Sequence, residues 1–188
     1  MKAKKTNILA VATGLLIAGL AVVASVATAN ANERAVPKGA VENGGSLWYT
    51  VDAIEGEWPG LIDELSGDLP GSVEFPDRPF QFFYQEPLPG EGGNGLVYFE
   101  EGIADQLVAR YWRCAWLDES LDGPRSASAR SEAAAHLANT APIEEANGVD
   151  FASYEAAIAR EASASGMSAT QFEFDIECGF FVSEGVNR

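Results

Sequence analysis

The stretch ARYWRCAWLDESL, residues 109–121, decides the fold of this chain because it places apolar side chains on two sides of one helix. On a helical wheel begun at residue 103, two apolar stripes recur at the spacing of helical turns. The first stripe comprises Ile103, Leu107, Tyr111, Cys114, Leu117 and Leu121, and the second comprises Val108, Trp112 and Trp116. A surface helix needs only one apolar face. We therefore predict a central helix over residues 103–121, with its first stripe packed on the domain core.

The second stripe, Val108, Trp112 and Trp116, has two alternative roles. It is covered by the proline- and glycine-rich aromatic segment at residues 67–95, or it is a binding face presented to a protein partner. The sequence leaves both alternatives open.

The same helix carries two arginines, Arg110 and Arg113. Charged side chains in a largely apolar helix are usually paired. We expect salt bridges with Asp105 or Glu119, or with carboxylates more distant in the sequence.

The first 31 residues are predicted to be a membrane anchor or a signal peptide. Three lysines in the first five residues precede residues 8–29, which contain no charged side chain. A helix over this run is about 33 Å long and matches a hydrocarbon core of about 30 Å. The lysines place the N-terminus in the cytoplasm and the rest of the chain outside. The length of the run favours a retained single-pass anchor. Small-x-small sites ending at Ala29 and Ala31 leave cleavage and secretion as the alternative.

The rest of the chain is strongly acidic. From residue 32 onward, 9 Lys and Arg residues accompany 28 Asp and Glu residues. A surface this negative repels phosphate backbones, which argues against nucleic-acid binding. It attracts cations or basic partners, although solubility alone also explains such a composition.

The two cysteines, Cys114 and Cys178, are predicted to form a disulfide, because two cysteines in one small extracytoplasmic domain usually pair. In the chain-entropy model, closing a loop of about 65 residues contributes roughly 4 kcal/mol to stability. Two free buried thiols are the main alternative. A nucleophilic Cys114 needs a base, and the only histidine is His136. A zinc site is a poorer interpretation, since two cysteines and one histidine do not complete a ligand set.

Residues 32–46 are polar and glycine-rich, which predicts a flexible linker before a single domain over residues 47–188. Within that domain, aromatic and β-branched residues predict a strand over residues 47–51. A brief helix is expected over residues 59–65, with Pro59 in its first turn.

Further elements follow from the spacing of apolar residues. Residues 80–85 and 96–100 are predicted to pair as a β-hairpin across a proline- and glycine-rich loop. Helices are expected over residues 125–139 and 150–165, the second with Asp150 as its N-cap.

Residues 171–178 (QFEFDIEC) fit two structures. Strict alternation of apolar and acidic residues predicts a half-buried strand, whereas Ser168 and Gln171 form a capping box that predicts a helix. The fold class expected for the whole chain is α+β, mainly α. A few packed helices and a small antiparallel hairpin or sheet follow an N-terminal hydrophobic helix.

Patterns that indicate chemistry are weak. Residues 118–123 (DESLDG) match the opening of a calcium loop, but the twelfth position is Ala129, where that loop needs a glutamate. In a strand, Glu173, Asp175 and Glu177 would line one face and could gather a divalent cation, although a solvated face is the simpler interpretation. No serine-hydrolase, zinc-protease or nucleotide-binding motif occurs. We therefore expect no catalytic residue, no metal site and no cofactor.

These observations predict an exported or membrane-anchored cell-envelope protein with one acidic extracytoplasmic domain. A binding or assembly role with a protein partner in the envelope is favoured. The alternative is an exported hydrolase that uses carboxylates or a metal ion.

Overall fold

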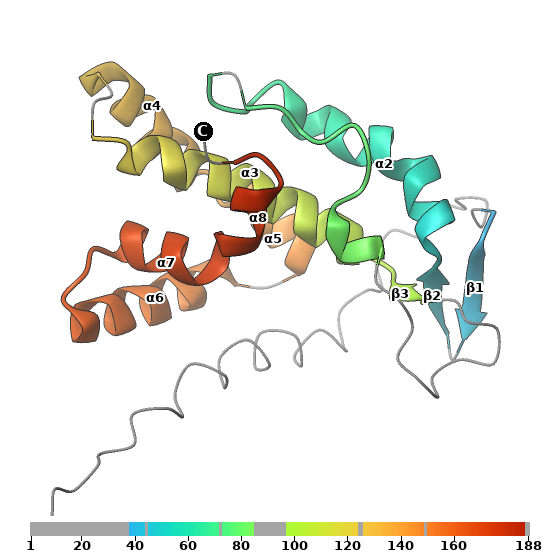
Figure 1. The fold of residues 1–188 in the computed structure, drawn as a ribbon. Helices are drawn as coiled ribbons and strands as arrows, with labels where there is room; N and C mark the ends of the chain where they lie inside the picture. Colours follow the sequence, from blue (N-terminus) through green and yellow to red (C-terminus); the bar gives the residue numbers. More distant parts are fainter. Residues whose placement is uncertain are drawn as a thin grey trace, which may run out of the picture. The chain divides into compact units, whose positions relative to one another are not determined.

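The computed structural model describes residues 38–43, 45–71, 73–84, 97–123, 126–148 and 150–186. All of them belong to the second of two compact units, Met1–Asn32 and Glu33–Arg188. The anchor or signal peptide predicted for residues 1–31 lies outside the described residues. The described part is mainly helical with one small antiparallel sheet, as the sequence predicts (Figure 1).

The sheet has three strands in the order β1-β2-β3, all antiparallel. Strand β2 (Ser46–Tyr49) is the one predicted over residues 47–51, and it pairs with β1 (Ala40–Asn43) and β3 (Phe99–Glu100). Strand β1 lies inside the predicted linker, so that prediction was wrong for residues 40–43. Two consecutive glycines at residues 44–45 favour a tight hairpin turn, and Gly45 has φ +89°.

The predicted hairpin between residues 80–85 and 96–100 was wrong. Phe99 and Glu100 pair with β2, and residues 81–84 form a 3₁₀-helix, η1 (Gln81–Tyr84). In a strand, Phe80 and Phe83 would point to opposite faces because their spacing is odd. A 3₁₀ turn puts residues three apart on one side, and both rings are buried.

Helix α2 (Val51–Ser66) begins earlier than predicted and contains Pro59 in its interior. Its buried side is formed by Ala53, Ile54 and Trp58, and the Trp58 indole N–H donates to the carbonyl of Pro76 at 2.8 Å. Pro59 is exposed on the other side. Packing of the apolar side therefore outweighs the backbone hydrogen bond that a proline removes.

Helix α3 (Ile103–Leu121) has the predicted bounds and the predicted central place. It lies among the other helices and contacts α2, α4, α5 and α7 (Figure 1). Every residue of the run 111–117 is buried.

The helices after α3 follow the predicted order with two additions. Helices α4 (Ala127–Ala138) and α6 (Phe151–Ser165) match the predictions, and the Asp150 side chain caps α6 by accepting from the Ala152 N–H at 3.1 Å. Helix α5 (Ala141–Asn147), which contains Pro142, was not predicted. Proline is favoured in a first helical turn, and here it stands at the start of α5.

Residues 169–177 are helical, so the helix alternative for QFEFDIEC is the one adopted. Helix α7 (Ala169–Glu177) is capped by the Ser168 hydroxyl, which accepts from the Gln171 N–H at 3.2 Å. After Cys178 the chain continues as the short helix α8 (Gly179–Ser183).

Candidate functional site

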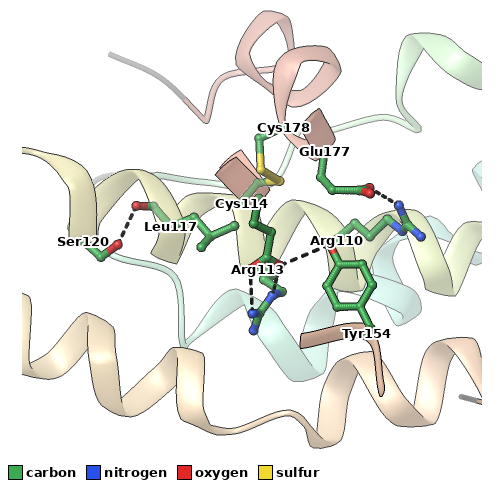
Figure 2. Close-up of a disulfide and its surroundings, with 9 residues drawn as sticks. Arg110, Arg113, Cys114, Leu117, Ser120, Tyr154, Glu177 and Cys178 are labelled. Atoms are coloured by element: carbon green, nitrogen blue, oxygen red, sulfur yellow. Dashed lines mark hydrogen bonds and ion pairs between the residues drawn. A yellow bond between two sulfur atoms is a disulfide. The ribbon is translucent and has the colours of Figure 1, made fainter. Parts of the chain in front are cut away.

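A disulfide joins the middle of α3 to the junction between α7 and α8 (Figure 2). It links Cys114 to Cys178, the pair expected from the sequence, with Cα atoms 5.5 Å apart and a sequence separation of 64. Both residues are buried, at 2% and 0% exposure. The bond therefore ties the C-terminal helices to the central helix inside the core.

Next to the disulfide, α3 and α7 share a buried ion pair. Arg113 Nε lies 2.5 Å from Glu173 Oε1, and Arg113 Nη2 donates to Glu173 Oε2 at 2.9 Å. The third guanidinium nitrogen donates to the Leu137 carbonyl at 3.2 Å, and the guanidinium carbon lies 4.4 Å from the centre of the Phe151 ring. Two parallel hydrogen bonds to one carboxylate fix the geometry of this pair. The arginine thus contacts α4, α6 and α7 at one point.

Tyr154 of α6 completes this cluster by contacting the same Glu173 oxygen as Arg113 Nε. Its hydroxyl donates to Glu173 Oε1 at 3.5 Å (Figure 2). Burial, and then the negative charges of Glu173 and Glu177, raise the pKa of Tyr154 above its usual value near 10. The tyrosine therefore stays a neutral hydrogen-bond donor at physiological pH. Nearer the start of α3, Arg110 pairs with Glu177.

These contacts replace the cation site that a strand would have offered. On a helix, Glu173 and Glu177 are four residues apart and face α3, where each meets an arginine. Asp175 points away and accepts from the Gln171 side chain at 2.7 Å. Among the residues that the structure describes, no group of three or more His, Cys, Asp and Glu side chains is placed to hold a metal ion.

The proposed partner face, Val108, Trp112 and Trp116, is buried at 1%, 1% and 3% exposure. This is the covered arrangement, so the face is not available to a partner in this structure. Helix α4 covers the two tryptophans in part: the His136 ring stacks on Trp116, with centroids 3.9 Å apart and planes inclined by 5°. The Trp116 indole N–H donates to the Asp68 carbonyl at 2.7 Å.

Aromatic rings of the segment at residues 67–95, which was one of the two alternatives for the tryptophan face, pack on Tyr111 of the other stripe. Phe75 and Phe80 lie 4.9 Å and 5.4 Å from the Tyr111 ring, measured between centroids. The Tyr111 hydroxyl donates to the Glu74 carbonyl at 2.7 Å. The two-faced pattern predicted a central helix, but it did not indicate which segment lies on which face.

The exposed apolar surface was not predicted from the sequence. Among the described residues, the large hydrophobic side chains that remain exposed are Val41, Ile176 and Phe180, at 43%, 42% and 38%. Ile176 and Phe180 are four residues apart and lie on either side of Cys178, whereas Val41 is on strand β1. The strand interpretation of residues 171–178 would have buried Ile176. In the structure Ile176 lies near the end of α7 and Phe180 near the start of α8, and both are exposed.

One hollow lies between α2, the sheet and the start of α3. Its apolar lining includes Tyr49, Ile54 and Leu61. Acidic side chains contribute the polar part of the lining, namely Glu57, Glu100, Glu101 and Asp105. Adjacent acids such as Glu100 and Glu101 do not form an acid–base pair by themselves, because neighbouring side chains diverge. The hollow is therefore a depression lined by acidic side chains rather than a recognisable catalytic centre.

Comparisons with protein-family models, with curated proteins and with solved structures found no match to this chain. In the part of the chain that the structure describes, no helix combines the length and apolar character needed to cross a bilayer. The predicted span at residues 8–29 lies outside that part.

Proposed function

We propose that this protein is a non-enzymatic binding or assembly domain that works outside the cytoplasm and is tethered there by residues 8–29. The observation that carries the proposal is the buried disulfide between Cys114 and Cys178. Stable structural disulfides are rare in the reducing cytoplasm and common in extracytoplasmic compartments. The charge-free run after the N-terminal lysines supports the same location.

The binding surface proposed for this domain is the exposed pair Ile176 and Phe180. The surface is held in place by the neighbouring disulfide, and Phe180 also contacts Phe80, with ring centroids 6.3 Å apart. A rigid apolar pair needs little further ordering when a partner binds. The acidic character of the domain favours a partner with basic side chains around an apolar contact.

The alternative function is an exported hydrolase, and the acidic hollow is the observation that favours it. Such an enzyme would place its reacting carboxylates among Glu57, Glu100, Glu101 and Asp105. Activity against a panel of ester, glycoside and peptide substrates that is lost in Glu57→Gln would support the hydrolase and count against a purely binding role.

Location is tested by intact-mass spectrometry on the protein from its native membrane and medium fractions. Thiols are alkylated with and without prior reduction. A membrane-bound chain with residues 1–31 present and no free thiol supports the anchored domain. A soluble chain that begins near residue 32 supports the secreted form. Alkylation of both cysteines without reduction contradicts the extracytoplasmic proposal.

The binding surface is tested by crosslinking in native membranes with matched variants. Ile176→Ser and Phe180→Ser should each reduce the yield of a specific crosslinked partner about tenfold or more, the loss expected for a central apolar contact. Val41→Ser is the control, since Val41 has a similar exposure on another element. Equal yields from all three variants would contradict this surface.

A further inference from the structure

The disulfide attaches residues 150–186, the C-terminal part of the domain, to the central helix α3. Helix α6 packs on α7, and α7 packs on α3 (Figure 1). Phe181 and Val186 join the main core, and Phe151 joins a smaller cluster with Ala109 and Ile143. The segment is therefore a hairpin of helices, α6–α8, that docks mainly on one side of the central helix.

The helices that make this contact are too short to be stable alone. Helix α7 has 9 residues and α8 has 5. Isolated helices shorter than about 12–15 residues are marginal in water. Their helical structure therefore depends on packing against α6 and α3.

The charged contacts of the docked hairpin orient it but contribute little net stability. Arg113 and Glu173 are buried at 7% and 6% exposure, so docking removes both charges from water. The desolvation cost of a buried pair roughly cancels its attraction. The second pair, Arg110 with Glu177, is more exposed and is screened by solvent. Net affinity of the hairpin for α3 therefore rests on a few apolar side chains and on the covalent bond.

We propose that stable docking of α6–α8 on α3 depends on the disulfide, so that oxidation completes the fold of the domain. Closing a loop of 64 residues favours the closed state on the order of 1,000-fold in the chain-entropy model. Before oxidation, the central helix with α2 and the sheet forms a partly complete domain, and α6–α8 samples undocked states.

The redox step is the formation of one S–S bond. The Cys114 and Cys178 thiols together lose two electrons and two protons, and a disulfide oxidant in the same compartment takes them up and becomes a dithiol. In the extracytoplasmic location proposed above, this step follows export. The conformational proposal itself needs neither a partner nor that location.

Hydrogen exchange followed by mass spectrometry tests the proposal on the full chain. Oxidised wild type is compared with wild type kept reduced in a phosphine, which has the same side chains and lacks only the S–S bond. Amides of α6–α8 should exchange between about 100- and 1,000-fold faster in the reduced protein. Amides of α2 and of the first half of α3 should change by less than about tenfold.

Two outcomes would overturn the proposal. If α6–α8 exchanges within about tenfold of its oxidised rate, docking does not need the bond. If α2, α3 and α6–α8 all accelerate equally, the disulfide stabilises the whole domain and no separable hairpin exists. A Cys114→Ala/Cys178→Ala variant provides a second measurement without reductant. Protease cleavage confined to residues 150–186 supports the proposal, and uniform resistance or uniform cleavage contradicts it.

Discussion

The buried pair between Arg113 and Glu173 provides the sharpest test of how the C-terminal helices are held. Removing one partner of a buried ion pair costs about 3–5 kcal/mol, because the other charge remains buried without compensation. In Glu173→Leu, Arg113 keeps the Leu137 carbonyl and the face of Phe151. We therefore expect a loss near 3 kcal/mol for this variant.

The reciprocal variant should be worse. In Arg113→Met, the Glu173 carboxylate keeps only the long hydrogen bond from Tyr154, so the expected loss is nearer 5 kcal/mol. The double variant has an apolar pair of similar volume and should recover to within about 2 kcal/mol of wild type. The order of the two single variants follows from the contacts that each remaining charge retains.

Urea unfolding followed by tryptophan fluorescence measures these differences, with the disulfide intact in every variant. The free energy of unfolding is obtained by linear extrapolation, and the slope should be the same for all variants. Arg160→Met is the control, because its pair with Glu161 is exposed, and it should change stability by less than about 0.5 kcal/mol. A loss below about 1 kcal/mol for Glu173→Leu, or a double variant as unstable as the sum of the singles, would refute the reasoning.

Three further predictions concern other parts of the domain. His136→Ala removes the ring stacked on Trp116, so it should cost at least about 1 kcal/mol and shift tryptophan emission to the red, as measured by thermal unfolding and fluorescence. Pro59→Ala restores a backbone donor inside α2 at an exposed position, so the melting temperature should rise by a few degrees, corresponding to about 1 kcal/mol; a lower melting temperature would contradict this. Burial, with a smaller effect from Glu184, raises the pKa of Tyr111 to about 12. The unfolded tyrosine ionises near pH 10, so the contribution of Tyr111 to stability is complete below pH 10 and is lost between pH 10 and 12, by roughly 3 kcal/mol. The difference between wild type and Tyr111→Phe in urea titrations at each pH measures this contribution.

Much of the helical part of the fold could be predicted from the sequence, because its signals are local. The bounds of α3 follow from apolar residues at helical spacing, and α6 begins at the capping residue Asp150. The disulfide follows from a count of two cysteines and an inferred compartment. Each of these inferences needs only residues that are near one another in the chain, or a property of the whole composition.

The remaining features depend on contacts between distant segments, and these leave weak local signals. Strand β1 has ordinary residues and exists because β2 pairs with it. Helix α2 runs through Pro59 because Trp58 is buried against the chain near Pro76. The sequence indicated that Arg113 needs a carboxylate, but the choice of Glu173, 60 positions away, depends on how α7 docks.

The conformation of residues 171–178 determines which side chains of α7 reach the surface. A strand would present Glu173, Asp175 and Glu177 on one face as a cation-binding row and would bury Ile176. The helix instead turns two of the acids toward α3, where Arg110 and Arg113 neutralise them. The same rotation turns Ile176 outward, four residues before Phe180. The Ser168 cap that favours the helix thus removes a candidate metal site and exposes an apolar one, which is why the binding proposal rests on α7 and α8.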